Sequence, residues 1–284
     1  MTSPPSLDHL AALTVLSGRT WHAEPLVHGR VEPVVRVTTT DDVAPPLDLV
    51  VRRVGPARGV DLDDEGPATV AAAALGVGPA VVEWRPEDRL LAVEHVTGRM
   101  VTRSDLLQPE PLARLCTALR RLHAAPEPFG QDLDLFAEAR RHPALVGDRL
   151  LAELESALGA HPEGSAPCHN DVVPGNFLDD GERIWLVDFE YAGNIAPSAE
   201  LACLVVGAEL GTADIPTIAA AYDGEATPLR VARIALWRVV QLVLWSEWAR
   251  AVASKSWADR LSAARDEAVA DPALRSWLDE VRRG

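Results

Sequence analysis

Four polar residues in the second half of the chain are spaced for phosphoryl transfer. They form His169-x-Asp171-x-x-x-x-Asn176, followed by an apolar run over 184–187 that ends at Asp188. Such chemistry needs a carboxylate near the attacking hydroxyl and two oxygen ligands for Mg²⁺ beside the nucleotide phosphates. We therefore predict His169 and Asp171 as catalytic residues, and Asn176 and Asp188 as metal ligands. The alternative is a polar turn between two strands, in which His169 and Asp171 satisfy only the local backbone.

Two short elements must position these groups. A compact loop over 171–176 can turn Asp171 and Asn176 into one cavity, because the step between them is short. The apolar residues 184–187 are typical of a buried strand, which would carry Asp188 at its end.

Length and charge limit the classes of protein. A chain of 284 residues fits one large or two modest domains. The net charge of −15 argues against nucleic acid as a partner, because phosphates would be repelled. The same charge is compatible with a cationic small molecule, but a solvated acidic surface is the preferred explanation, because net charge reports solubility before function.

Other features favour a cytoplasmic protein. The longest apolar stretch, 231–248, is interrupted by Arg233, Arg238 and Gln241, so no membrane span is predicted. The first residues lack the pattern of a secretory signal. The three cysteines are widely spaced, which predicts reduced core thiols, not zinc ligands. A homodimer is left open.

The hydrophobic pattern predicts two lobes. Residues 1–95 are expected to form a mostly antiparallel nucleotide-binding lobe, with strands over 26–38, 47–54, 80–84 and 90–95, a helix over 7–15, and a helix from Asp63 through 74. Residues 96–284 are expected to form a helical catalytic and substrate-binding lobe, with helices over 112–123, 133–158, 199–210, 229–253 and 256–283, the last with a break near Asp271-Pro272. The junction is predicted at about 94–98.

The motifs carry a resemblance that covers residues 16–265. They are Leu16-Ser17-Gly18, Val50-Val51-Arg52, residues 60–65, Val96-Thr97-Gly98-Arg99, Arg121-Leu122-His123, the loop 169–176, and Asp188-Phe189-Glu190-Tyr191-Ala192-Gly193. In these segments the chain resembles the choline/ethanolamine kinase and aminoglycoside phosphotransferase superfamily. The Glu190-Tyr191 pair is more similar to the choline kinase branch. The resemblance implies an α+β, bilobal, protein-kinase-like fold, with ATP as donor and Mg²⁺ as cofactor.

The resemblance also implies roles for the nucleotide side. Arg52 would contact the α- and β-phosphates, and Glu65 would hold it through a carboxylate–guanidinium pair. Ser17 and Gly18 belong to the loop over the phosphates. The alternative for Arg52 is an ordinary surface cation of the strand.

At the junction of the lobes, the backbone of three residues would meet the adenine edge. They are Glu94, His95 and Thr97. His95 could equally be a plain hairpin residue, because this contact hardly constrains the side chain.

The loop at 16–21 departs from the superfamily. Relatives usually carry two adjacent glycines and then Thr-Asn, whereas this chain has Ser17-Gly18-Arg19-Thr20-Trp21. One glycine still permits a tight turn, but we expect Arg19 and Trp21 to add bulk where the backbone should approach phosphate. The choice between ATP and GTP therefore stays open.

Aromatic residues suggest an acceptor with an ammonium group. Trp245 and Trp248 lie three apart on one helical face, and choline kinases carry a matching pair in the substrate pocket. Glu190, Tyr191 and Trp257 are predicted as further substrate contacts. Ring faces attract a quaternary cation without hydrogen bonds. The alternative is that the pair packs the helical core.

The predicted function is transfer of the γ-phosphate of ATP to a hydroxyl of a small, amine-bearing metabolite. Two alternatives stay open. One is an aminoglycoside or other natural-product O-phosphotransferase. The other is a catalytically weak pseudokinase that acts as a nucleotide-binding or interaction protein, suggested by the altered loop at 16–21.

Overall fold

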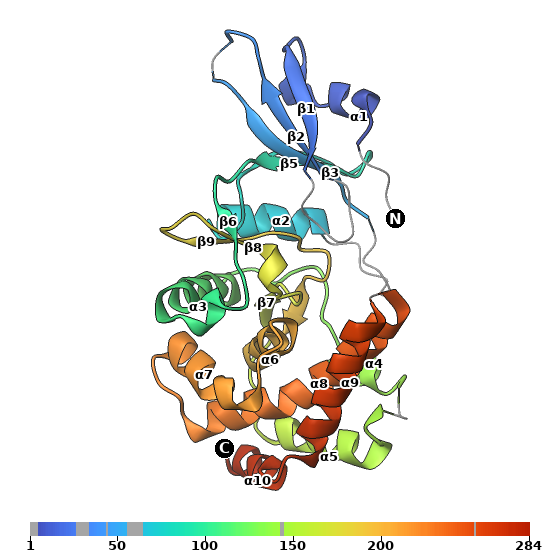
Figure 1. Ribbon diagram of the computed structural model, residues 1–284, viewed down its shortest axis with the longest axis vertical. Helices are drawn as coiled ribbons and strands as arrows, with labels where there is room; N and C mark the ends of the chain where they lie inside the picture. The colour runs from blue at the N-terminus through green and yellow to red at the C-terminus, as the bar shows by residue number, and fades with distance from the viewer. Residues whose placement is uncertain (1–4, 27–33, 44, 56–64, 143–144, 253) are drawn as a thin grey trace. The chain divides into compact units, whose positions relative to one another are not determined.

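The described residues form two compact units. The computed structural model describes residues 5–26, 34–43, 45–55, 65–142, 145–252 and 254–284 (Figure 1). The first unit combines 1–101 with 175–192, and the second combines 102–174 with 193–284. The first is mainly strand and the second mainly helix, so the predicted α+β bilobal class is confirmed.

A five-stranded antiparallel sheet is the main element of the first unit. Its strands, in the order β1-β2-β3-β5-β4, are β1 (Trp21–Leu26), β2 (Val34–Thr39), β3 (Asp48–Arg53), β4 (Val81–Arg85) and β5 (Leu90–Glu94). Alternate residues of β2 and β3 are buried, as expected for strands with one face on a core. α1 (Leu7–Ala11) and η1 (Thr14–Leu16) add Leu10, Leu13 and Leu16 to that core.

One strand of this sheet was not predicted. β1 is polar and contains Pro25, which suits its position at the edge of the sheet, where a missing N–H is tolerated. The predicted strand 26–38 crosses residues outside the described part, and its remainder forms β2. The predicted start of the next helix at Asp63 also lies outside that part; α2 is described as Glu65–Ala74.

α2 packs very closely on the sheet. A Cβ atom at Gly66 would lie only 2.2 Å from the Trp84 ring of β4, so only glycine allows this approach. The contact places Glu65, at the first turn of α2, against the sheet.

A small second sheet explains why residues 175–192 group with the first unit. It contains β6 (Arg99–Met100), β8 (Phe177–Asp179) and β9 (Ile184–Leu186) in the order β6-β8-β9. The N–H of Leu186 donates to the carbonyl of Val77, 2.8 Å away, which ties β9 to the segment after α2. The predicted boundary at 94–98 therefore differs from the division of the described chain at Val101 and Thr102.

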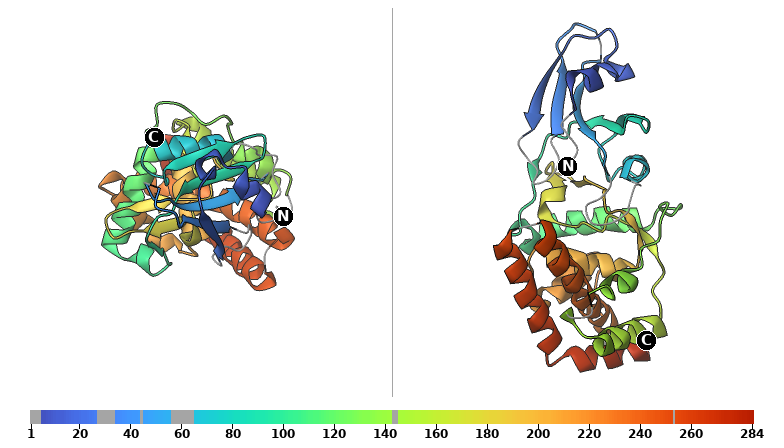
Figure 2. Two further views of the ribbon diagram at one scale, coloured as in Figure 1. Left: turned by 90° about the horizontal axis from the view of Figure 1, so that it is seen from above. Right: turned by 90° about the vertical axis from the view of Figure 1, so that its right-hand side faces the viewer.

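The second unit is a helical assembly around α8. Its helices are α3 (Pro109–His123), α4 (Leu135–Ala139), α5 (Asp148–Ala160), α6 (Pro197–Gly207), α7 (Ile215–Asp223), α8 (Pro228–Val252), α9 (Lys255–Ala270) and α10 (Leu274–Arg283). α6, α9 and α10 all pack on α8 (Figure 2). Two short strands, β7 (Ala166–Cys168) and β10 (Gly193–Ile195), and the 3₁₀ turns η2 (Asp105–Leu107) and η5 (Thr212–Asp214) complete the second unit, while the turn η4 (Pro174–Asn176) lies at the division between the two units.

Two helical predictions differ from this unit. The helix expected over 133–158 is two helices, because Gly147 precedes α5 with a φ of 78° that a continuous helix does not allow. α7 was not predicted, since it is short and its apolar pattern covers only about two turns.

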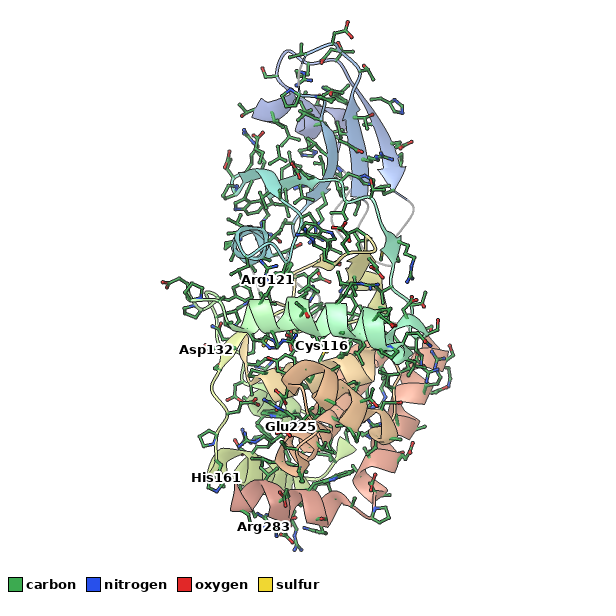
Figure 3. All side chains as sticks on the ribbon, turned by 90° about the vertical axis from the view of Figure 1, so that its left-hand side faces the viewer. Cys116, Arg121, Asp132, His161, Glu225 and Arg283 are labelled. Carbon is green, nitrogen blue, oxygen red and sulfur yellow. The ribbon has the colours of Figure 1, made fainter. Side chains whose placement is uncertain are left out.

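Burial and hydropathy agree with two further predictions. All three cysteines are free thiols in the interior, including Cys116 on α3 (Figure 3). Among the helices that the structure describes, none has the length and apolar content required to span a bilayer.

Candidate functional site

Arg52 connects two acidic residues of the first unit. It lies on β3, and its guanidinium forms an ion pair with Glu65 of α2. Its Nη1 also donates to Oδ1 of Asp188 at 2.8 Å. The side chains of Arg52 and Glu65 are 13% and 3% exposed. The structure thus brings Arg52 and Glu65 together, and it adds the contact with Asp188, which was not predicted.

Asp188 and Asn176 come from neighbouring chain segments. The N–H of Val187 donates to the carbonyl of Asn176 at 3.0 Å, which continues the β8–β9 pairing by one step. Asp188 then has a φ of 71°, which turns the chain out of the ladder. Such backbone strain persists only where surrounding contacts stabilise it, and here Arg52 holds the side chain.

The donor set of these two residues fits Mg²⁺. Asn176 offers an amide oxygen and Asp188 a carboxylate, of which Arg52 engages one oxygen. Magnesium prefers hard oxygen ligands and usually uses one or two protein groups besides phosphate and water. These residues would hold the ion, which would neutralise charge on the phosphates.

The loop at 16–21 differs from the expectation in one respect. Gly18 has a φ of 71°, and a Cβ there would meet no atom within 4 Å. Arg19 was expected to add bulk at the loop. Its guanidinium instead turns to Asp41, in the connection between β2 and β3, with Nε 3.0 Å from both carboxylate oxygens. The expectation about Arg19 is therefore wrong, because this ion pair draws the side chain away.

The predicted adenine-contacting residues lie at the end of β5. The N–H of Glu94 donates to the carbonyl of Ala80, and that of His95 donates to the carbonyl of Asp48. The His95 ring also lies 3.3 Å from the Asp48 carboxylate. Thr97 is exposed beyond them. Their contact with a nucleotide stays a prediction.

In the second unit, backbone hydrogen bonds to two buried side chains fix the loop that carries Asp171. His169 is fully buried, and its Nδ1 accepts the N–H of Asp171 at 3.3 Å. Asn170 has a φ of 61°, and its N–H donates to Oε1 of Glu200 at 2.8 Å. His169 therefore acts on the conformation of this loop, while Asp171 is partly exposed.

Glu200, on α6, belongs to a buried hydrogen-bonded row. Its other oxygen pairs with Nε2 of His123, whose Nδ1 lies 2.6 Å from the Tyr222 hydroxyl. Burial alone would raise the pKa of Glu200, but His123 and the Asn170 N–H more than offset it, so the pKa lies below its ordinary value. The resemblance implied a structural hydrogen bond at Glu200, where relatives carry Asp, but its pairing with His123 was not predicted, and His123 was noted only as part of a motif.

Cys168 lies beside this row. Possible ligand atoms of His123, Cys168 and Glu200 lie within 4.8 Å of one another. Burial raises the pKa of the Cys168 thiol well above its ordinary value. Both His123 nitrogens have hydrogen-bond partners, one of which is Glu200 itself, so we interpret the group as a hydrogen-bonded cluster.

Three predicted substrate residues meet in the second unit. Trp245 and Trp248 on α8 and Trp257 on α9 form a triangle with ring centroids 6.3, 5.8 and 5.7 Å apart. Trp257 stands edge-on to the other two, at 87° and 86°. All three are only partly buried.

Gly207 relates this triangle to the loop of Asp171. A Cβ at Gly207 would lie 2.9 Å from the Val172 carbonyl, 2.9 Å from the Val173 side chain and 3.3 Å from the Trp245 ring. The end of α6 is therefore pressed between the residues after Asp171 and Trp245. Nothing in the sequence pattern predicted this role for Gly207.

Other predicted pairs fall in different units. Glu190 and Tyr191 belong to the first unit, whereas the three tryptophans belong to the second. Asp171 likewise belongs to the second unit, and Asn176 and Asp188 to the first. Their joint action stays a prediction from the motif.

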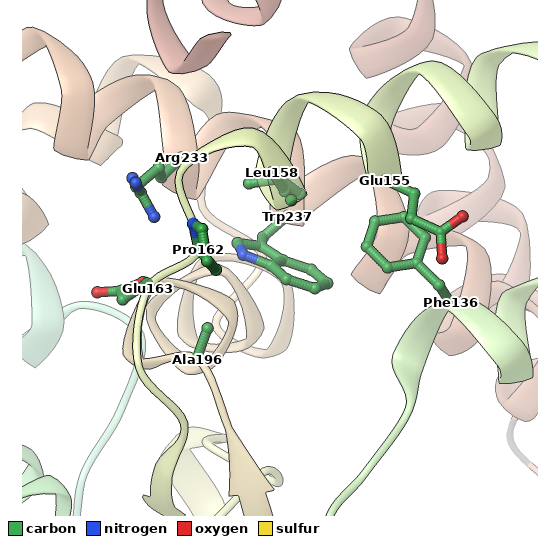
Figure 4. A pocket seen from close by; sticks show the side chains of 9 residues that line it. Phe136, Glu155, Leu158, Pro162, Glu163, Ala196, Arg233 and Trp237 are labelled. Atoms are coloured by element: carbon green, nitrogen blue, oxygen red, sulfur yellow. The ribbon is translucent and has the colours of Figure 1, made fainter. Parts of the chain in front are cut away.

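A separate pocket of about 230 Å³ opens in the second unit (Figure 4). It is mainly apolar, and none of the predicted site residues lines it; its lining is Phe136, Glu155, Leu158, Gly159, Pro162, Glu163, Ala196, Arg233 and Trp237. Its three charged side chains already bind protein groups, namely Arg140, Arg230 and the His161 carbonyl. The pocket therefore offers little to orient a polar ligand.

Known proteins are similar to this chain in sequence and in fold. LicA of Haemophilus influenzae is 26% identical over 159 residues, which are 49% of this chain and 60% of that protein. The chain thus matches less than two thirds of this relative. A choline/ethanolamine kinase family protein from Mesorhizobium loti has a TM-score of 0.80 and 26% identity, covering 98% of each chain.

A second solved structure is choline kinase LicA from Streptococcus pneumoniae. It has a TM-score of 0.71 and 17% identity, covering 93% of this chain and 99% of that one. LicA has also been solved in complex with AMP, and that structure has a TM-score of 0.68 and 19% identity. These neighbours confirm the predicted protein-kinase-like fold.

A family model that matches most of the chain identifies the family to which it belongs. The model of the phosphotransferase enzyme family matches residues 22–237, which include Arg52, Glu65, Asp171, Asn176 and Asp188. The predicted resemblance, and with it the class of small-molecule kinases, is confirmed at the level of the family. The chain belongs to the phosphotransferase enzyme family.

Proposed function

We propose that this protein transfers the γ-phosphate of ATP, with Mg²⁺, to a hydroxyl of a small cationic metabolite of the choline or ethanolamine type. The main support for ATP as the phosphate donor is the contact of Arg52 with both Glu65 and Asp188. A fixed guanidinium and a metal ion held by a nearby carboxylate would together stabilise the negative charge of the nucleotide phosphates. The complex of LicA with AMP supports nucleotide binding.

Each residue has a distinct part in the proposed reaction. Asp171 orients the acceptor hydroxyl and accepts its proton. Arg52 stabilises charge on the phosphates, while Asn176 and Asp188 hold Mg²⁺. His169 and Glu200 keep the Asp171 loop in place through the hydrogen bonds at Asp171 and Asn170. Most of the acceleration is then positioning and electrostatics.

The triangle of Trp245, Trp248 and Trp257 supports a cationic acceptor. Trp257 contacts the other two rings edge to face, and all three rings stay partly exposed. A cation on an outer ring face would lie within about 6 Å of a ring centroid. Gly207 places Trp245 close to the residues after Asp171. The names of the kinases from Mesorhizobium loti and Streptococcus pneumoniae agree with this choice.

The test is ADP release across choline, ethanolamine, thiamine, amino sugars and aminoglycosides, with ATP and with GTP. We expect choline or ethanolamine to be preferred, and choline to exceed its uncharged carbon isostere 3,3-dimethylbutanol by roughly 5–30-fold in kcat/KM, as a cation–π energy of about 1–2 kcal/mol predicts. Trp245→Ala should abolish that preference, while Trp277→Ala, on α10, should keep it. Preference for an aminoglycoside would favour the antibiotic-kinase alternative.

Metal binding has its own test. Asp188→Asn should lower turnover by orders of magnitude with every accepted substrate, because it removes a charged ligand of the metal. Wild-type turnover by that variant would contradict the assignment. If the folded wild-type protein binds no Mg·ATP in calorimetry, the pseudokinase alternative is favoured instead.

A further inference from the structure

Arg19 and Asp41 form a fixed connection between the loop at 17–20 and the segment that joins β2 to β3. Arg19 binds Asp41 through Nε at 3.0 Å and through Nη2 at 2.9 Å. The same Nη2 donates to the carbonyls of Val43 at 2.6 Å and Pro45 at 3.2 Å. The two side chains are only 11% and 15% exposed, so this pair is well shielded for a surface loop.

Asp41 also binds the backbone of the loop directly. It accepts the N–H of Thr20 at 2.7 Å and that of Val43 at 3.1 Å. The carboxylate therefore receives hydrogen bonds from both segments and from the guanidinium. These contacts lower the pKa of Asp41 to about 2, chiefly through Arg19, so the group is ionised throughout the neutral range.

A second carboxylate fixes the chain just before the loop. Glu83 of β4 accepts the N–H groups of Thr14 and Val15, each at 2.9 Å, at the start of η1. The loop at 17–20 thus lies between two anchored points, with Gly18 at a φ of 71° between them. A loop held at both ends loses less conformational entropy when a ligand binds.

We propose that the Arg19–Asp41 pair positions the loop at 17–20 for the nucleotide phosphates and thereby replaces the second glycine and the Thr-Asn that this loop lacks. This inference rests on the proposed function. The loop then needs no glycine-rich sequence that adapts to the phosphates, because Arg19 and Asp41 fix its conformation before the nucleotide binds. Arg19 is a positioning residue here, since its guanidinium is bound to protein groups.

The variants separate this role from general stability. Asp41→Asn removes the charge but keeps the shape, and Arg19→Lys keeps the charge but loses the planar fork. The matched control is Asp88→Asn, which weakens another Arg–Asp contact of the same sheet, between Arg85 Nε and Asp88 at 2.7 Å. All three should unfold within a few degrees of the wild type.

Two measurements on the full chain test the proposal. In amide hydrogen exchange without nucleotide, Asp41→Asn should speed exchange at Thr20 and Val43 at least about tenfold, while Asp88→Asn should not. In kinetics, Asp41→Asn and Arg19→Ala should raise KM for Mg·ATP about tenfold, with kcat and the acceptor KM nearly unchanged, and Arg19→Lys should fall between.

Each outcome decides the matter. Unchanged exchange at Thr20 in Asp41→Asn would show that the pair does not hold the loop. Faster exchange with an unchanged KM for Mg·ATP would show that the held loop does not serve the nucleotide. If the wild type binds no Mg·ATP while exchange responds as expected, the proposed function fails and the loop anchor alone stands, so the nucleotide role is refuted.

Discussion

Replacing Glu200 by alanine should destabilise the second unit strongly. Glu200 is fully buried, pairs with His123 and accepts the Asn170 N–H. Alanine would leave Nε2 of His123 and the N–H of Asn170 without their partner in the interior, together with a small cavity. Removing one partner of a buried pair costs about 3–5 kcal/mol. For a chain of this size that corresponds to a fall of roughly 6–20 °C in the melting temperature.

Glutamine at this position separates charge from hydrogen bonding. Its carbonyl can still accept from Asn170, and its amide can donate to a neutral His123 nitrogen. We therefore expect Glu200→Gln to lose less stability than Glu200→Ala. Both should lower kcat, since Asn170 fixes the loop that presents Asp171.

The measurement is calorimetric unfolding of both variants beside a matched control. Glu155→Ala makes the same substitution in α5, where the side chain pairs with Arg140 at the surface and is 43% exposed. Exposed pairs contribute about 0–1 kcal/mol, so the control should change little. A loss below about 1 kcal/mol in Glu200→Ala would refute the reasoning, because the buried row would then contribute no more than a surface pair.

Three further predictions concern the second unit. Gly207→Ala should cost about 1–3 kcal/mol and reduce turnover, because its Cβ would press on the Val172 carbonyl at 2.9 Å; calorimetry and steady-state rates check this. The folded protein should not react with a thiol reagent at pH 8, since burial raises the pKa of Cys116 to about 12 and those of Cys168 and Cys203 well above the ordinary value; denaturant should release all three. The pKa of Glu200 is below its ordinary 4.5, so its stabilising contribution is present above that pH and lost as pH falls through the folded value; the wild type should lose stability below pH 4.5 more steeply than Glu200→Gln in acid titrations.

The sequence predicted the elements whose pattern is local. The β4–β5 hairpin and the long helix α8 are close to their expected bounds, because apolar periodicity and turn residues define them. β1 was missed since its polar edge-strand pattern carries little signal. The interruption before α5 was missed although Pro143 and Gly147 mark it in the sequence.

The candidate site was predictable to the extent that motifs encode it. The contact between Arg52 and Glu65 followed from a resemblance. The contacts of Arg19 with Asp41 and of His123 with Glu200 did not, because they join residues 22 and 77 positions apart, and no local pattern reports such a pairing. Side-chain direction at Arg19 also depends on the partner it finds.

The close approach of Gly66 to Trp84 has a consequence for how this protein tolerates change. The indole occupies the space in which any side chain at 66 would have to fit, and the next residue back is Glu65, which binds Arg52. A methyl group added there would lift the start of α2 from the sheet and withdraw the carboxylate from its cation. The ion pair of Arg52 with Glu65 thus depends on a residue that has no side chain and no charge. A mutational scan that is interpreted only from the charge and polarity of side chains would overlook Gly66.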